Sequence, residues 1–304
     1  MSVSGTGSSQ GAPPGKAAQY LPFDPHPRAP RPLPPPLSCD SQFHVFGPRE
    51  RYPVRAGAAY EMPTATIETA LALHRTLGIE RGVIVQATTY GADHQVVLDG
   101  LIAAGSNYRG CANAVVLTDS DDGYIDRLDK AGVRGARFTR QGLGLAVPPA
   151  VMERSLARVR ELGWYAKFQP EPTGILDSLP MLEKLEIPVI IDHMARPDPA
   201  QGIDDPNLIA VRRLLQRGNF WVMLSLSEKI SKAGAPWDDV VPIAEAYIDV
   251  APDRIIWGSD WPHPVSVKQP PNEGDLLELL YRFAPDPAIR KKILVDNPAT
   301  LFGF

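Results

Sequence analysis

The stretch Ile175–His193, ILDSLPMLEKLEIPVIIDH, contains the two patterns that decide the fold. In its first part, leucines recur at every third position, which predicts a helix with one buried face. The run Val189–Ile191 that follows is apolar on both faces, as expected of a strand buried inside a parallel sheet. This strand ends in Asp192 and His193, so polar side chains stand where a strand gives way to a loop.

The same alternation repeats along the chain from residue 38 onward. The eight predicted strands are Ser38–Phe46, Gly82–Gln86, Tyr108–Ala114, Val133–Phe138, Trp164–Gln169, Pro188–His193, Phe220–Ser225 and Arg254–Gly258. The predicted helices are Thr66–Leu77, His94–Ala104, Ser120–Ala131, Pro149–Leu162, Ile175–Leu185, Asn207–Gln216, Asp238–Val250, Gly274–Phe283 and Pro287–Val295. Eight repeats favour a closed α/β barrel of the (β/α)8 TIM type over an open sheet. The first strand is not followed by a glycine-rich phosphate loop, which counts against a dinucleotide-binding fold.

Residues 1–37 differ in composition from the rest of the chain. Ser and Gly dominate the first ten residues, and Pro25–Pro36 is dense in proline. Such a segment has too little apolar side chain to offset its ordering entropy. We therefore predict a flexible or extended arm, followed by one catalytic domain over residues 38–304. The arm could also lie along a neighbouring subunit, which leaves a homo-oligomer open.

Charge and composition exclude several classes of protein. The net charge is −4 and no Lys/Arg-rich run appears, so we expect no nucleic-acid partner. The apolar runs are far shorter than the ~20 residues of a membrane span, and the N-terminus lacks a signal-peptide pattern. Cys39 and Cys111 lack the spacing of a disulfide framework or a zinc knuckle. These features predict a cytoplasmic protein with reduced thiols and no membrane partner.

Each predicted strand ends in polar side chains, and barrel enzymes place their chemistry at these ends. The first strand carries Asp40, Gln42 and His44 at period two, so the three side chains share one face. The other strand ends carry Gln86 and Thr88, Asn113, Arg137, Gln169, Asp192 and His193, Ser225 with Lys229 beyond it, and Asp260. We therefore expect an active site at the carboxyl ends of the strands.

Asp260 is the candidate general base. It ends the last strand in an aromatic setting, where we expect partial desolvation to raise its pKa towards useful basicity. His193 and His44 are candidate catalytic imidazoles that polarise a carbonyl or orient water. Each of these residues also has a structural alternative. Asp260 could cap a loop, and His193 and His44 could be hydrogen-bonded histidines of the core. Asp40 is as consistent with bracing its neighbours, and we interpret His263 as a loop anchor.

Arg137 is the candidate anion clamp, because a guanidinium fits a carboxylate with two prongs. Arg140 and Lys229 are expected near it as further substrate-binding cations. The alternative for Arg137 is a structural ion pair.

The strand-end motifs resemble those of the amidohydrolase superfamily. The similarity is to the branch that contains 2-pyrone-4,6-dicarboxylate lactonase, 4-sulfomuconolactone hydrolase and D-galactarolactone isomerase, and it covers about Cys39 to Phe304. The motifs that carry it are Asp40–Pro48 (DSQFHVFGP), Val85–Thr88 (VQAT), Ala131–Phe138 (AGVRGARF), Ile191–Asp198 (IDHMARPD), Trp257–Pro264 (WGSDWPHP) and Asp296–Pro298 (DNP).

The resemblance implies that Asp260 activates water, that His193 lies near a lactone carbonyl and that Arg137 binds a substrate carboxylate. His44 matches the second histidine of the family's first strand, and Tyr60 resembles a substrate-contacting tyrosine. Two positions depart from the lactonase. Its arginine is Lys229 here, and its loop arginine aligns near Leu143, so Arg140 is the candidate substitute. Four more side chains complete the expected substrate contacts: Gln42, Gln86, Thr88 and Gln169.

The family pattern on the first strand is Asp-x-His-x-His, whose histidines often hold a divalent metal. Here Gln42 occupies the first histidine position, and an amide oxygen is a poor zinc ligand. The fifth strand offers Lys167 and Gln169 but no histidine. We therefore predict no catalytic metal and no cofactor.

The function predicted from these residues is hydrolysis of a small carboxylated lactone by water that Asp260 activates. Three alternatives remain open. The same base could serve a lactone isomerase, the chain could be a metal-dependent hydrolase or decarboxylase of the wider superfamily, or the barrel could bind a carboxylated ligand without turnover.

Overall fold

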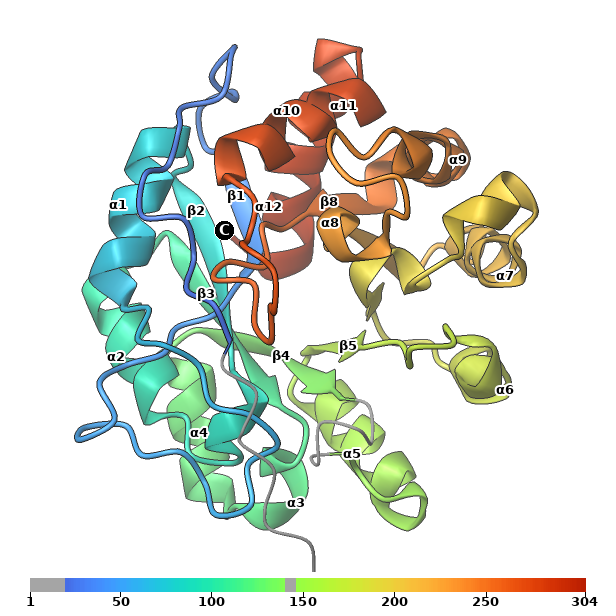
Figure 1. Cartoon of the computed structure of the whole chain (residues 1–304). Helices are drawn as coiled ribbons and strands as arrows, with labels where there is room; N and C mark the ends of the chain where they lie inside the picture. The colour runs from blue at the N-terminus through green and yellow to red at the C-terminus, as the bar shows by residue number, and fades with distance from the viewer. Residues whose placement is uncertain (1–19, 140–145) are drawn as a thin grey trace, which may run out of the picture.

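The computed structural model describes residues 20–139 and 146–304, which form a nearly closed TIM barrel with helices between the strands (Figure 1). The eight strands are parallel and pair in chain order: β1 (Cys39–Phe43), β2 (Arg81–Val85), β3 (Tyr108–Asn113), β4 (Val133–Phe138), β5 (Tyr165–Phe168), β6 (Val189–Ile191), β7 (Phe220–Leu224) and β8 (Ile255–Trp257). The α-helices are α1 (Ile67–Leu77), α2 (Gln95–Ala104), α3 (Val116–Asp119), α4 (Asp122–Lys130), α5 (Pro149–Glu161), α6 (Leu179–Leu182), α7 (Pro206–Leu215), α8 (Ser227–Ile230), α9 (Val241–Val250), α10 (Glu273–Phe283), α11 (Pro287–Lys291) and α12 (Asn297–Phe302). The predicted barrel is confirmed.

One predicted helix is wrong in form. Instead of a continuous helix over Ile175–Leu185, the chain makes the 3₁₀ turn Leu176–Ser178 and then the short α6. Leucines at every third position match the three residues per turn of a 3₁₀ helix, and Pro180 favours the start of a helix over its interior. Of these leucines, Leu182 is fully buried while Leu176 is 42% exposed.

Two apolar layers hold the barrel together. The larger lies between the sheet and the surrounding helices. The smaller fills the inside of the barrel and contains Val83, Cys111, Tyr165, Ile190, Trp221, Met223 and Ile256. Towards the carboxyl ends of the strands this lining changes to polar side chains such as Gln42, Arg137 and Asp260.

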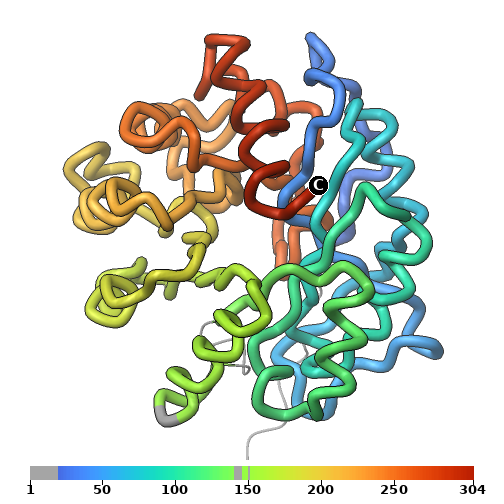
Figure 2. Tube along the Cα trace, turned by 180° about the vertical axis from the view of Figure 1, so that it is seen from behind, coloured from blue at the N-terminus to red at the C-terminus, as the bar shows by residue number. Residues whose placement is uncertain are grey.

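The C-terminus belongs to the inner layer. Phe302 packs edge-on against Tyr165 with 5.4 Å between the ring centroids. The guanidinium groups of Arg81 and Arg109 lie 5.2 and 4.8 Å from the ring centre of Phe304. Seen from behind, the red C-terminal segment runs in towards the blue segment that carries β1, where the chain ends (Figure 2). The last residues therefore contribute to the barrel core.

The seam between β1 and β8 is joined by residues that follow β8. The backbone nitrogen of Asp260 donates to the Gln42 carbonyl at 2.9 Å, and that of His44 donates to the Trp261 carbonyl at 2.7 Å. Gly258 allows this approach, because a Cβ atom there would lie 2.9 Å from the backbone nitrogen of Gln42. The seam thus fixes the backbone of Asp260 against the first strand.

The described part of the proline-rich arm, residues 20–37, is extended and lies against the barrel (Figure 1). The Arg28 side chain bonds to the Asp275 and Glu278 carboxylates of α10. The Phe23 ring packs on Trp261 with 4.8 Å between centroids. These contacts agree with the extended form of the expected arm for residues 20–37, and residues 1–19 lie outside the described residues. In the described ranges, none of the helices combines the length and the apolar character needed to cross a bilayer.

Candidate active site at the carboxyl ends of the strands

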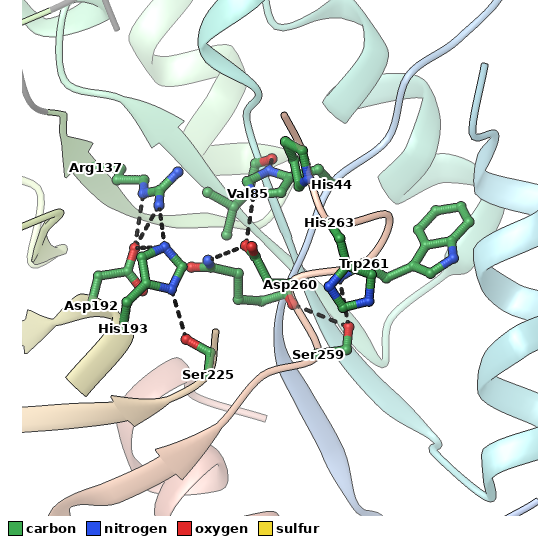
Figure 3. Close-up of polar contacts among 12 residues, drawn as sticks. His44, Val85, Arg137, Asp192, His193, Ser225, Ser259, Asp260, Trp261 and His263 are labelled. Atoms are coloured by element: carbon green, nitrogen blue, oxygen red, sulfur yellow. Dashed lines mark hydrogen bonds and ion pairs between the residues drawn. The ribbon is translucent and has the colours of Figure 1, made fainter. Parts of the chain in front are cut away.

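Asp260 lies at the barrel mouth and is 4% exposed. Its Oδ1 accepts a hydrogen bond from Nε2 of Gln42 at 2.7 Å, and Nε2 of His44 lies 3.3 Å from the same oxygen (Figure 3). Oδ2 has no hydrogen-bond partner within residues 20–139 and 146–304 and is not sealed from solvent. One oxygen of the carboxylate is thus fixed, while the other is free to accept a proton.

His44 is held between two oxygen atoms. Nδ1 lies 2.7 Å from the Val85 carbonyl oxygen, which can only accept, so Nδ1 carries a proton. Nε2 faces Oδ1 of Asp260 at 3.3 Å. The imidazole therefore links the end of β2 to the carboxylate of Asp260.

The expected rise in the pKa of Asp260 is wrong in direction. Burial alone raises this pKa, but the contact with His44 and the positive charge of Lys229 outweigh the burial, and the pKa lies well below its usual range. Asp260 is therefore ionised at neutral pH. Any basicity must come from desolvation of the free oxygen when substrate binds.

Arg137 is held by a carboxylate of this chain. Its Nε and Nη2 donate to Oδ2 of Asp192 at 3.0 and 2.7 Å. Burial tends to lower the pKa of Arg137, but the charge of Asp192 outweighs it, so the guanidinium stays protonated. The two-pronged edge expected to bind substrate is thus occupied, and Nη1 is the edge without a hydrogen bond to the described residues.

His193 is neutral and has both ring nitrogens engaged. Nη2 of Arg137 lies 3.1 Å from its Nε2 and can only donate, so Nδ1 carries the proton and donates to Oγ of Ser225 at 2.8 Å (Figure 3). Burial lowers its pKa to about 4. The residues from His193 to Arg196 all have positive φ, a conformation uncommon outside glycine. In this arrangement His193 orients Arg137, and it has no spare N–H for a carbonyl.

Tyr60 and Thr88 lie together, with Oγ1 of Thr88 donating to the Tyr60 hydroxyl at 3.1 Å. Gln86 turns its amide nitrogen to the carbonyls of Gly91 and Asp93, so it holds the loop after β2.

The remaining predicted substrate-binding residues are less tightly grouped. Gln169 lines a cavity of about 700 Å³ together with Phe138 and Phe168, and its buried Oε1 has no hydrogen-bond partner among the described residues. Lys229 is exposed on α8, donates to the Pro264 carbonyl at 2.8 Å and lines a different groove. Arg140 lies outside the described residues.

Behind Asp260, a buried chain of polar contacts crosses the seam. Asp40 accepts from the backbone nitrogen of Ser259 with Oδ1 at 2.9 Å and from the Ser259 hydroxyl with Oδ2 at 2.5 Å, and Nε2 of His74 lies 3.3 Å from the same Oδ2. The hydroxyl of Tyr108 completes the chain at 2.9 Å from Nδ1 of His74. This agrees with the bracing interpretation of Asp40.

His263 lies fully buried between Glu228 and Glu273, at 3.2 and 3.3 Å. Burial tends to lower its pKa, but the hydrogen bonds to the two carboxylates outweigh this effect and raise it to about 10. The loop that carries Asp260 is thus tied to α8 and α10, in agreement with the interpretation of His263 as an anchor.

Sequence reasoning missed the roles of Lys167 and Asp192 beside Arg137. From the sequence, we interpret Lys167 only as a residue that cannot bind a metal. A lysine that faces inward from a central strand is rarely buried without a charged partner, and this could have indicated the ion pair. Its Nζ lies 3.2 Å from Oδ1 of Asp192.

The residues present do not fit a divalent metal. In the ranges that the structure describes, no three His, Cys, Asp or Glu side chains are arranged to hold one. Gln42 presents its amide nitrogen to Asp260, and His44 directs Nε2 to the same carboxylate. An N–H donor therefore stands where a metal would need a lone pair.

The comparisons with known proteins agree with this fold. The model of the family described as "Amidohydrolase" matches residues 39–304. A 4-sulfomuconolactone hydrolase from Rhizobium radiobacter is 39% identical over 87% of this chain and 89% of its own length. A 2-pyrone-4,6-dicarboxylate hydrolase from Comamonas testosteroni is 32% identical (87% and 90%), and a D-galactarolactone isomerase from Agrobacterium fabrum is 31% identical (90% and 94%).

Solved structures give the same result. A crystal structure from Agrobacterium tumefaciens matches with a TM-score of 0.78 at 29% identity, covering 91% of this chain and 99% of the other. A probable 2-pyrone-4,6-dicarboxylic acid hydrolase from Acinetobacter baumannii with citric acid bound matches with a TM-score of 0.75 at 26% identity, covering 88% and 100%. The chain belongs to the amidohydrolase family.

Proposed function

We propose that this protein hydrolyses a small carboxylated lactone without a metal, using water activated by Asp260. The observation that carries the proposal is the asymmetric environment of the Asp260 carboxylate. Gln42 and His44 hold Oδ1, while Oδ2 is unengaged by the described residues at the barrel mouth. A carboxylate oriented in this way can take a proton from one water molecule without losing its position.

Relatives support the choice of substrate class. Proteins 39% and 32% identical to this chain are named as hydrolases of 4-sulfomuconolactone and of 2-pyrone-4,6-dicarboxylate. The Acinetobacter structure contains citric acid, which is a polycarboxylate. On this basis we assign a lactone with at least one carboxylate as the substrate of this chain.

In the proposed reaction, the substrate carboxylate binds to the Nη1 edge of Arg137. Water then attacks the ring carbonyl as its proton passes to Oδ2 of Asp260. The tetrahedral intermediate collapses with cleavage of the ring C–O bond, and the proton on Asp260 goes to the departing oxygen. His193 holds Arg137 in place, and His44 holds the base. A positioned base of this kind contributes ~10²–10⁴-fold to the rate.

A lactone isomerase is the second candidate, because a relative that covers 90% of this chain is named D-galactarolactone isomerase. The same base would then deliver a hydroxyl of the substrate to the carbonyl in place of water. Product analysis in ¹⁸O water separates the two reactions, since isomerisation leaves the product unlabelled.

The deciding experiment is proton release from a panel of carboxylated lactones, with protein pretreated with a chelator. We expect turnover by the wild-type chain and a loss of ~10²-fold or more in Asp260→Asn. The matched control is Asp253→Asn, a surface carboxylate paired with Lys292. Full activity in Asp260→Asn contradicts the assigned base, and activity that needs added metal contradicts metal independence. The cytoplasmic location and the homo-oligomer remain predictions from the sequence.

A further inference from the structure

Two buried cations share one buried carboxylate beneath the barrel mouth. Arg137 on β4 and Lys167 on β5 are partners in the register of the two strands. Asp192, at the end of β6, accepts from Arg137 with Oδ2 and lies 3.2 Å from Nζ of Lys167 with Oδ1. The lysine side chain is 1% exposed and the aspartate is not exposed at all.

The charges of this cluster do not balance. Two positive groups face one negative group, because the charge of Asp192 is maintained by its neighbours, whose effect on its pKa outweighs burial. Nearby Cys111 stays a neutral thiol, since burial raises its pKa to about 11, and His193 is neutral as described above. Asp260 carries a further negative charge that acts on Arg137, but it forms no ion pair with Arg137 or Lys167 among the described residues. Within the ion-paired cluster the positive groups therefore outnumber the negative ones, and burial lowers the pKa of Lys167.

An excess buried charge is unfavourable unless an anion joins it. Nζ of Lys167 and Oδ1 of Asp192 lie close but make no well-aligned hydrogen bond. Lys167 thus contributes charge more than a directional contact. Without Lys167, the charge of Asp192 would neutralise that of Arg137. The Nη1 edge of Arg137 would then belong to an ion pair with no net charge.

We propose that Lys167 is a positioning residue that makes the site select anionic substrates. By balancing Asp192, it leaves Arg137 with a net positive charge to offer to a carboxylate. This inference rests on the proposed function, because it names the group that gives the lactonase its requirement for a carboxylated substrate. Lys167 itself does not touch the substrate.

The test uses citrate as the probe and isothermal titration calorimetry as the readout, so that it does not depend on turnover. Lys167→Met should weaken citrate binding by roughly 10- to 100-fold, since it removes one charge from a poorly screened site. Lys292→Met is the matched control, because that lysine pairs with Asp253 at the surface and should leave citrate affinity unchanged.

The double variant Lys167→Met/Asp192→Asn separates charge from packing. It restores the net charge of +1, and the asparagine oxygen still accepts from Arg137. We expect its citrate affinity to return to within about 3-fold of the wild-type value. Additive loss in the double variant, or wild-type affinity in Lys167→Met, overturns the inference. Lys167→Gln, which keeps a donor beside Asp192, serves if the methionine variant does not fold, and the same loss of affinity is expected.

Failure of this inference and failure of the proposed function give different results. If the panel of lactones is not turned over but the citrate series behaves as expected, the anion site stands and lactone hydrolysis falls. If lactones are hydrolysed but citrate affinity does not depend on Lys167, only the role of Lys167 is wrong. An absence of citrate binding by the wild-type chain also overturns the inference.

Discussion

Gln42 donates from its amide nitrogen to Oδ1 of Asp260 at 2.7 Å, across the seam that joins the first strand to the loop after the last. Because the backbone nitrogen of Asp260 also bonds to the Gln42 carbonyl, one residue fixes both the main chain and the carboxylate of the candidate base. An amide at this position therefore decides which oxygen of Asp260 is left for water.

Replacing Gln42 with Glu should reduce turnover at neutral pH by ~10²-fold. Two carboxylates at this distance cannot both ionise, so the pKa of Asp260 rises from its depressed value. Activity requires ionised Asp260, so it is lost as the pH falls through the raised pKa. The acidic limb of the kcat profile should therefore lie at higher pH in Gln42→Glu than in the wild type.

The matched control is Gln95→Glu. Gln95 also donates from Nε2 to an aspartate at 2.7 Å. Its partner Asp99 lies one turn further along the same helix, α2, and not among the residues of the candidate site. An unchanged kcat profile in this variant, with an altered profile in Gln42→Glu, assigns the effect to Asp260. Equal profiles in both variants refute the role of Gln42.

The strands and the inward-facing polar residues could be predicted from the sequence, because both depend on local periodicity. Val189–Ile191 is apolar on both faces wherever it lies in a parallel sheet, and Arg137 faces inward by its position in β4. The hydrogen bonds from Arg137 to Asp192 could not be predicted. That contact joins β4 to β6 past β5, so it depends on the curvature of the closed barrel.

The proline-rich arm shows the same limit. Its composition predicts little ordering, because it carries few apolar side chains. The contacts that fix residues 20–37 instead come from far along the chain, as with Arg28 and Glu278, which are 250 residues apart in sequence. A local reading of the sequence contains no signal for an ion pair of this separation.

His94 should make the protein less stable in acid. It is fully buried, its Nδ1 donates to the Ala92 carbonyl, and its Nε2 accepts from the backbone nitrogen of Asn113. Burial lowers its pKa to about 4, below the ~6.5 of an unfolded chain. Between these values the unfolded state binds more protons, so stability falls as the pH falls, by up to roughly 3 kcal/mol.

Urea unfolding at several pH values between 7 and 4 tests this assignment. The slope of the unfolding free energy against pH should be smaller in His94→Gln than in the wild type. His26→Gln is the control, because the side chain of His26 is exposed on the arm and its removal should leave the slope unchanged. A wild-type slope in His94→Gln contradicts the prediction.

His263 should act at the other end of the pH range. Its pKa in the folded protein, about 10, exceeds the ~6.5 of an unfolded histidine, so the folded state binds more protons between these values. The stabilisation is fully present below pH ~6.5 and is lost as the pH rises through about 10. The Tm of the wild type should therefore fall more steeply from pH 7 to 10 than that of His263→Gln, and parallel curves would contradict the role of the buried pair of glutamates.

Phe302 should be essential to stability while remaining remote from chemistry. Its side chain is 1% exposed and packs inside the barrel against Tyr165, so Phe302→Ala leaves a cavity in the inner core. Such truncations cost about 3–5 kcal/mol of unfolding free energy.

Phe304→Ala is the control, because that ring is partly exposed beneath two guanidinium groups and its removal should lower the unfolding free energy much less. Chemical denaturation measures both values, and kcat per folded molecule should stay near wild type in each variant, since the candidate site lies at the opposite ends of the strands. A large fall in kcat for folded Phe302→Ala would mean that the inner core transmits its packing to Asp260.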